Sequence, residues 1–124
     1  MIKWQRWHYV FGGLKIMTKF EIAQMIKNKL VETINPKSIV LFGSLARNED
    51  REDSDIDLLI VWDEQKDLPN IKRRVIIRKI IGVVERPLDI LTCTTEELKK
   101  ALDDRNSFTS RIISEGEVIY GRFN

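Results

Sequence analysis

The sequence has few of the residues that build disulfide frameworks or common metal sites. Its 124 residues include one cysteine, Cys93, and one histidine, His8. A single cysteine excludes a disulfide within the chain, and no cluster of cysteine and histidine ligands for zinc can form. A cysteine content this low is typical of a reducing compartment, so we expect a cytoplasmic protein. Any metal that the chain binds must be held by carboxylates.

Long apolar runs are also absent. The run from Ile56 to Trp62 is among the longest, it contains Asp57, and it is far shorter than the roughly 20 apolar residues that span a bilayer. Hydrophobic residues make up 43% of the chain and charged residues 32%. This composition supplies a core and a solvated surface, and it predicts one soluble domain without a membrane partner.

Residues 1–16 differ in composition from the rest. They are rich in aromatic residues rather than the aliphatic ones of a secretory signal, and they hold three of the 21 basic residues and no acidic ones. Without them the net charge would change from +2 to −1. Met17 offers a second start, so we interpret 1–16 as a leader of doubtful origin and 17–124 as the domain. If the leader folds, its aromatic residues could cover an apolar patch or a contact in a homo-oligomer.

Hydrophobic periodicity and turn residues predict an alternation of helices and strands. Helices are expected over 19–31, 44–50, 70–81, from Thr94 or Thr95 to Ala101, and over 106–114. Strands are expected over 38–42, 55–62, 87–92 and 117–120. The order predicts a small α/β sheet packed by helices.

Three aspartates stand where apolar strand residues would be expected. Asp55 and Asp57 open a strand whose following residues are apolar, and Asp89 interrupts another apolar strand. Because side chains alternate between the faces of a strand, Asp55 and Asp57 share one face, where two like charges need a stabilising cation. Three carboxylates on adjacent strands would suit Mg²⁺ or Mn²⁺. The alternatives are a solvated strand edge for the pair and a structural ion pair for Asp89.

Gly43 and Ser44 follow the first predicted strand and precede a helix. Glycine lets the backbone approach a ligand closely, and the free amide groups at a helix N-terminus favour phosphate. The same sequence is also ordinary turn and cap chemistry. Combined with the aspartates, however, it fits a nucleoside triphosphate with its metal ions.

These features together resemble a known family. Gly43-Ser44, followed after ten residues by Asp55-x-Asp57, is similar to the signature of the DNA polymerase β nucleotidyltransferase superfamily. The stretches Phe42-Gly-Ser-Leu-Ala-Arg47 and Ser54-Asp-Ile-Asp-Leu58 resemble its minimal nucleotidyltransferase (MNT) branch. The resemblance covers roughly Phe20 to Tyr120, and it implies a single-domain nucleotidyltransferase fold with a small mixed sheet.

The resemblance also implies roles for individual residues. Asp55, Asp57 and Asp89 would be catalytic residues that hold two Mg²⁺ ions, or Mn²⁺, and Asp89 would help to activate the attacking hydroxyl. Gly43 and Ser44 would hold the triphosphate of ATP, and Arg47 would face its phosphates. The implied reaction is the transfer of AMP to an acceptor hydroxyl, with pyrophosphate as the leaving group. The family commonly has glycine where this chain has Asn48, a residue that tolerates left-handed backbone.

Larger relatives carry further domains that hold the acceptor, and this chain has no length for one, so we expect part of the acceptor site to come from elsewhere. MNT proteins are often antitoxins of HEPN toxins, which are helical ribonucleases, and some transfer AMP to a toxin tyrosine. The resemblance therefore implies a HEPN-type helical protein as partner and acceptor. The alternative is a weakly active or inactive MNT-fold module that neutralises its partner by contact.

A third hypothesis is nucleic-acid binding through the basic helix over 70–81. We rank it last, because this helix lacks the aromatic residues that stack on bases. Its cations are interpreted as a solvated face, with contact to nucleotide phosphates or to an acidic partner by Arg73, Arg74 or Arg78 as the alternative. We interpret Trp62 as a core or rim residue rather than a base-stacking one, and Cys93 as a small buried residue.

Overall fold

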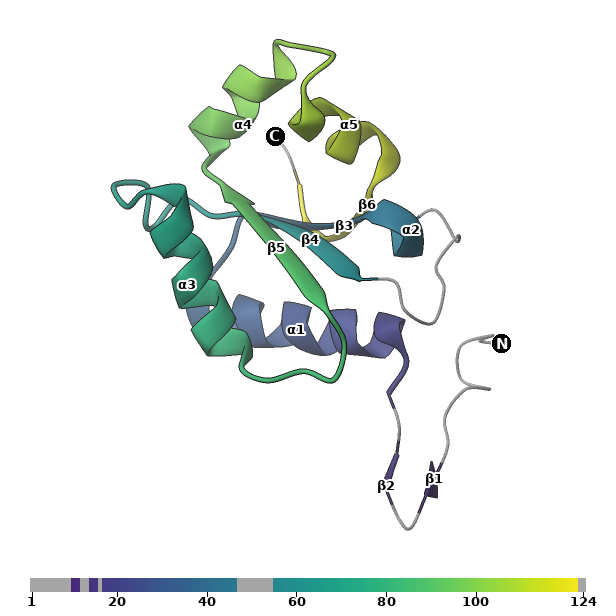
Figure 1. Cartoon of the computed structure of the whole chain (residues 1–124). Coiled ribbons are helices and arrows are strands. Elements are labelled where there is room, and N and C mark those ends of the chain that lie inside the picture. The colour runs from purple at the N-terminus through teal and green to yellow at the C-terminus, as the bar shows by residue number, and fades with distance from the viewer. Residues whose placement is uncertain (1–9, 12–13, 16, 47–54, 123–124) are drawn as a thin grey trace.

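The structure is a computed structural model that describes residues 10–11, 14–15, 17–46 and 55–122. Its centre is a four-stranded sheet in the order β5-β4-β3-β6. Helices α1 and α3 cover one face of this sheet, and α4 and α5 cover the other (Figure 1). The predicted small α/β sheet packed by helices is confirmed.

Three of the longer helices begin at capping residues that the sequence marks. Helix α1 (Lys19–Ile34) starts after Thr18 and α4 (Thr95–Leu102) after Thr94, each with a capping box completed by a glutamate three residues on. Helix α5 (Phe108–Glu115) starts after Ser107, whose hydroxyl accepts from the Ser110 amide. The two remaining helices are α2 (Gly43–Ala46) and α3 (Asn70–Ile81).

The observed bounds agree with the predicted ones to within a few residues. Helix α1 continues three residues past the predicted end and stops at Asn35, which is left-handed (φ 52°). Helix α3 has the predicted bounds and ends at Gly82, where φ is +75°. The predicted helix over 44–50 is seen only as α2, since 47–54 lie outside the described residues.

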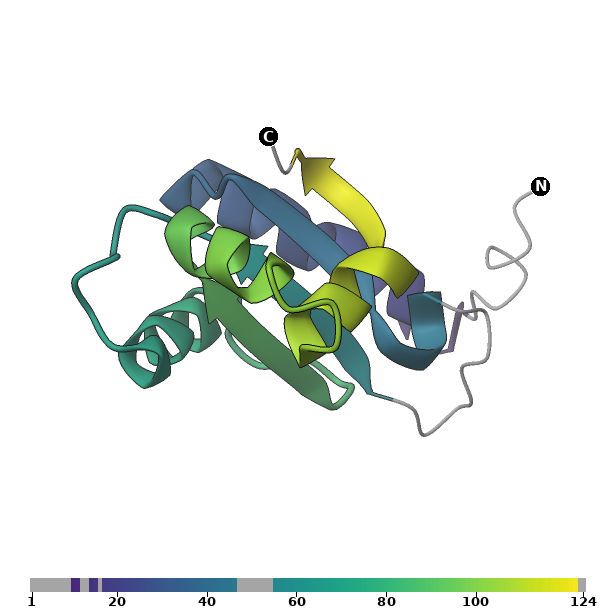
Figure 2. The same ribbon diagram turned by 90° about the horizontal axis from the view of Figure 1, so that it is seen from above.

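The sheet is mixed in direction. Strand β3 (Ser38–Phe42) pairs antiparallel with both β4 (Ile56–Val61) and β6 (Glu117–Gly121). Strand β5 (Leu88–Cys93) pairs parallel with β4. Consequently the end of β3 and the beginnings of β4 and β5 meet at one end of the sheet, where α2 also begins (Figure 2).

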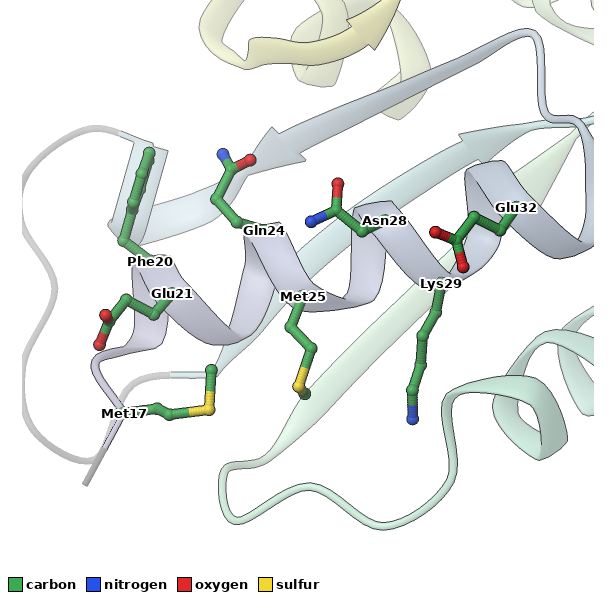
Figure 3. Close-up of a pocket in the computed structure, with 8 residues that line it drawn as sticks. All are labelled: Met17, Phe20, Glu21, Gln24, Met25, Asn28, Lys29 and Glu32. Carbon is green, nitrogen blue, oxygen red and sulfur yellow. The ribbon is translucent and has the colours of Figure 1, made fainter. Parts of the chain in front are cut away.

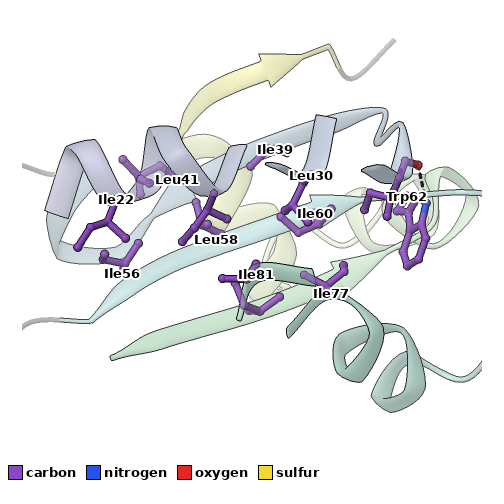
Figure 4. Close-up of a cluster of buried hydrophobic side chains, with 14 residues drawn as sticks. Ile22, Leu30, Ile39, Leu41, Ile56, Leu58, Ile60, Trp62, Ile77 and Ile81 are labelled. Carbon is purple, nitrogen blue, oxygen red and sulfur yellow. Dashed lines mark hydrogen bonds between the residues drawn. The ribbon is translucent and has the colours of Figure 1, made fainter. Parts of the chain in front are cut away.

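Each face of the sheet has its own buried cluster. Alternate strand residues such as Leu41, Leu58 and Ile90 pack with α1 and α3 (Figure 4). The intervening residues, Val40 and Leu59 among them, pack with α4 and α5. Trp62 belongs to the first cluster, where its indole Nε1 donates a hydrogen bond to the Ile34 carbonyl at 3.0 Å. Its interpretation as a core residue is confirmed.

The segment 1–16 contains two short strands that the sequence did not predict. Strands β1 (Val10–Phe11) and β2 (Leu14–Lys15) pair antiparallel as a separate sheet. Glycines between two short runs are a hairpin signal, and Gly12 and Gly13 stand between these strands in the sequence. Among the described helices, none is both long and apolar enough to cross a membrane.

Candidate functional site

Asp57 and Asp89 are neighbours across the two parallel strands. Their Cα positions are register partners in the pairing of β4 with β5. The residues before and after them point to the α1–α3 side, where Leu58 and Ile90 are buried. Alternation therefore directs both aspartates to the α4–α5 side. The two carboxylates start from adjacent positions on one face, as the sequence predicts.

Asp55 lies at the same end of the sheet. It is exposed and stands one residue before β4. The next amide, that of Ile56, donates to the Pro87 carbonyl at 2.9 Å, which joins the beginning of β4 to the beginning of β5. Asp55 and Asp57 are two positions apart in the sequence, with Ile56 between them, so a continued strand alternation gives both the same face.

Gly43 lies directly against Asp57. Its φ is +76°, and a Cβ placed on it would lie 3.0 Å from Cγ of Asp57 and closer still to a carboxylate oxygen. The preceding residue, Phe42, is the register partner of Asp57. A side chain at position 43 would therefore displace the carboxylate, and a positive φ disfavours any residue but glycine. The glycine of the predicted phosphate turn thus has a packing reason in this fold.

The phosphate-binding prediction concerns Gly43, Ser44 and Arg47. Ser44 is half-buried in α2, at the end of β3 that faces the start of β4. Arg47 lies outside the described residues. The structure therefore brings Gly43 and Ser44 to the same end of the sheet as the three aspartates.

The donor set has the chemistry of a magnesium site, since carboxylate oxygens are what Mg²⁺ prefers. The side chains do not converge into a complete cage, however. In the ranges that the structure describes, no group of three or more His, Cys, Asp or Glu side chains is placed to hold a metal ion. The structure therefore agrees with the prediction in its backbone register, which places Asp57 beside Asp89, and not in a formed set of metal ligands.

Arg73 has a structural role and is not available to phosphates. It is buried, and its two terminal nitrogens donate to the Glu97 carboxylate at 2.8 and 3.0 Å. Its Nε donates to the Leu68 carbonyl at 2.9 Å. The Arg73 guanidinium lowers the pKa of Glu97 to about 2. Arg73 is therefore not part of the solvated face that the sequence predicts, and the alternative that it reaches a nucleotide is also wrong.

Cys93 and Arg78 also have assigned surroundings. Cys93 is buried, and burial raises the pKa of its thiol to about 12. This agrees with the prediction of a small buried residue.

Arg78, on the exposed side of α3, donates from one terminal nitrogen to the Leu88 carbonyl at 2.9 Å. This contact ties α3 to the residue that precedes Asp89.

An aromatic pair beside this end of the sheet was not foreseen. The rings of Phe42 and Phe108 stand edge to face, with centroids 6.3 Å apart and an interplanar angle of 85°. Phe42 is buried, whereas Phe108, the first residue of α5, is 62% exposed. No sequence signal identifies Phe108, because the contact joins residues far apart in the chain.

A shallow hollow of about 420 Å³ follows α1 (Figure 3). It is lined by Met17, Phe20, Glu21, Gln24, Met25, Asn28, Lys29 and Glu32. None of the three aspartates lines it, and α1 covers the sheet face opposite to Asp57 and Asp89. Its chemistry is therefore separate from that of the predicted site.

The family is shown by comparison with known proteins. Residues 24–123 match the family model "Polymerase beta, Nucleotidyltransferase". The chain is 33% identical over 104 residues to "Putative protein adenylyltransferase MJ1379" of Methanocaldococcus jannaschii, a match that covers 81% of this chain and 91% of that protein. It is 40% identical over 57 residues to "Putative protein adenylyltransferase MJ1215" of the same organism, covering 45% of this chain and 66% of that protein.

Two solved structures share the fold. "Crystal structure of a putative nucleotidyltransferase from Sulfolobus solfataricus" is 18% identical with a TM-score of 0.62, covering 84% of this chain and 81% of that chain. "Crystal structure of the toxin-antitoxin with AMP-PNP" is 21% identical with a TM-score of 0.52, covering 80% of this chain and 73% of that chain. The chain belongs to the polymerase beta nucleotidyltransferase family. It is a small nucleotidyltransferase that resembles the MNT branch.

Proposed function

We propose that this chain transfers AMP from ATP to a hydroxyl group of a protein acceptor. One observation carries the proposal: Asp57 and Asp89 are register partners on one face, and Gly43 packs against the Asp57 carboxylate. Carboxylates and a phosphate turn at a common end of the sheet are what phosphoryl chemistry requires, because charge on the transferred group must be neutralised and positioned. The relatives named as protein adenylyltransferases support this choice of nucleotide and acceptor.

The family resemblance suggests a role for each residue. Asp55, Asp57 and Asp89 would hold two divalent metal ions. These ions would be Mg²⁺, or Mn²⁺ in place of Mg²⁺. Bound metal would supply positive charge at the entering and leaving oxygens. The Gly43 and Ser44 backbone and the Ser44 hydroxyl would bind the β and γ phosphates, and Arg47 would add a cation there.

The reaction balances as an in-line displacement. The acceptor oxygen forms a bond to the α phosphorus of ATP, and the bond from that phosphorus to the bridging oxygen of the β phosphate breaks. Pyrophosphate leaves with the electron pair, and the hydroxyl proton passes to Asp89 or through it to water. Asp89 suits this role because it is exposed at the beginning of β5 and an incoming group can reach it.

The proposed partner is a HEPN-type helical toxin whose tyrosine receives AMP, with this chain as its antitoxin. The fold neighbour that is a toxin-antitoxin with AMP-PNP supports both a partner and an adenine nucleotide.

The test uses the protein with its co-purified partner, Mg²⁺ and ATP radiolabelled on the α phosphate, which is the phosphate that stays with the transferred AMP. Label on the partner is expected for the wild type, and a loss of at least about 100-fold for Asp57→Asn and for Asp89→Asn. Asp67→Asn is the matched control, because Asp67 is an exposed acid in the loop after β4. Labelling that survives both site variants, or that needs no divalent metal, would refute the proposal.

The alternative is a contact module with little chemistry. One observation favours it, namely that the described acidic side chains do not gather in threes around a metal position. In that case the partner would be inhibited without ATP and equally well by the Asp57→Asn variant. Partner inhibition that requires both ATP and Asp57 would exclude this alternative.

A further inference from the structure

Phe108 is an exposed aromatic residue next to the proposed site. Among the large apolar residues that are exposed in the described part of the chain, Phe108 is the one aromatic residue. The others are Ile71, Val75, Val83, Leu102 and Val118. Exposing 62% of a phenylalanine leaves a large apolar surface in water, which costs free energy unless a ligand or partner covers it. The location of the ring indicates which of these covers it.

The ring lies on the same face of the sheet as the paired aspartates. Phe42 belongs to the cluster on the α4–α5 side, and it is the register partner of Asp57. Phe108 reaches this residue from α5, with 6.3 Å between ring centroids. Helix α5 packs against both β3 and α2, which Figure 2 shows side by side. Phe108 is thus one ring contact away from the residue that precedes Gly43.

The ring is also held in place. The edge-to-face contact with buried Phe42 fixes one side of Phe108. The start of α5 is fixed by Ser107, whose hydroxyl accepts from the Ser110 amide at 3.0 Å and donates to the Ala101 carbonyl at 2.9 Å. A ring that is anchored on one side and exposed on the other is a preorganised platform, because little side-chain freedom remains to be lost on binding.

We infer that Phe108 is the stacking platform for the nucleobase of the bound nucleotide. The inference rests on the proposed function, which places the triphosphate at Gly43 and Ser44. A nucleotide held there must extend its base beyond the turn, and the aromatic pair offers an apolar surface in that neighbourhood. An aromatic ring stacks on any base, so Phe108 contributes affinity for the base as a class and leaves the choice between bases to polar groups.

A partner that presents its tyrosine to the site also approaches this end of the sheet, but it has no phosphate end. Ile71 and Val75, which are also exposed, lie on α3, which covers the opposite face of the sheet. Phe108 instead touches the strand residue that joins Asp57 to the phosphate turn. Its position is explained by a ligand that occupies both places at once, and a nucleotide has an apolar end and a phosphate end.

The experiment uses calorimetry to compare the binding of two ligands, ATP and inorganic tripolyphosphate. Mg²⁺ is present in both titrations. Phe108→Leu keeps an apolar contact with Phe42 but removes the aromatic face. Its affinity for ATP is expected to fall at least about fivefold, since stacking on an aromatic ring is worth roughly that factor or more. The affinity for tripolyphosphate should not change. Phe108→Trp should restore ATP binding, and its indole fluorescence should change when ATP is added.

The matched control is Ile71→Ala, which removes a 64% exposed apolar side chain from α3. It should leave the affinities for both ligands unchanged. Equal ATP affinity of the wild type and Phe108→Leu would overturn the inference while leaving the proposed function intact. Equal losses for ATP and tripolyphosphate would also overturn it, since the ring would then act on the phosphate turn. A wild type that binds neither ligand would remove the proposed function and this inference together.

Discussion

Gly43, the first residue of α2, lies so close to Asp57 that a side chain at position 43 would meet the Asp57 carboxylate. A Cβ there would lie 3.0 Å from Cγ of Asp57. The proposed phosphate turn and the strand proposed to bind metal are therefore in direct contact, and the glycine allows both to keep their positions. Position 43 thus requires glycine for two reasons, its positive φ and the lack of space for a side chain beside Asp57. The two reasons can be tested independently.

Gly43→Ala is expected to abolish AMP transfer, because the new methyl group displaces the Asp57 carboxylate. Gly82→Ala is the matched control: Gly82 has a φ of +75°, close to the +76° of Gly43, but nothing lies within 4 Å of its Cβ position. Both variants should lose about 1–3 kcal/mol of unfolding free energy from backbone strain. Chemical denaturation and the labelling assay measure the two effects. Comparable activity of the two variants would show that space at Gly43 is unimportant.

The Arg73–Glu97 pair predicts a loss of stability in acid. Hydrogen bonds from Arg73 lower the pKa of Glu97 from 4.5 to about 2 in the folded protein. The carboxylate therefore stabilises the fold fully above pH 4.5, and this contribution is lost as the pH falls toward 2. In urea titrations the wild type should exceed Glu97→Gln in unfolding free energy at pH 7, and the difference should shrink at pH 3. A difference that is constant with pH would contradict the assignment.

Cys93 is expected to resist alkylation in the folded protein. Burial raises the pKa of its thiol to about 12, so almost no reactive thiolate exists at pH 8. Iodoacetamide should modify the native protein far more slowly than the urea-unfolded protein, as followed by mass spectrometry. Cys93→Ser serves to show that no other residue takes the label. Native labelling at the rate of the unfolded chain would mean that the thiol is accessible.

Trp62→Phe is expected to lower the unfolding free energy by about 1–3 kcal/mol, because the Ile34 carbonyl loses its indole donor in a buried place. Trp62 lies at the opposite end of β4 from Asp57, one residue beyond the strand. The affinity for ATP should therefore stay unchanged. Thermal or urea denaturation and calorimetry give the two values, and a loss of ATP affinity with unchanged stability would reverse this division of roles.

Sequence reasoning was strongest where the physics is local. The predicted helix start at Thr94 or Thr95, and the apolar alternation that places Asp57 opposite to Leu58, depend on residues close in the chain. The pairing of Asp57 with Asp89 required strand order, which follows from long-range packing that no local pattern encodes. The family resemblance supplied that link, and the register agrees with it.

Two features could not be obtained from the sequence at all. Arg73 stood among other cations of one helix, and nothing local distinguished it as the one that becomes buried against Glu97. Phe108 joined the surroundings of Asp57 only through a ring contact with Phe42. Both depend on how α3, α4 and α5 pack, so they are visible only in three dimensions.

The hollow along α1 lies on the side of the sheet away from the aspartates. A small molecule bound there would not share space with ATP at the proposed site, because the sheet stands between the two positions. Inhibitors found at that position would therefore be expected to lower the maximal rate without competing with the nucleotide, and they would select for resistance at residues outside the chemistry.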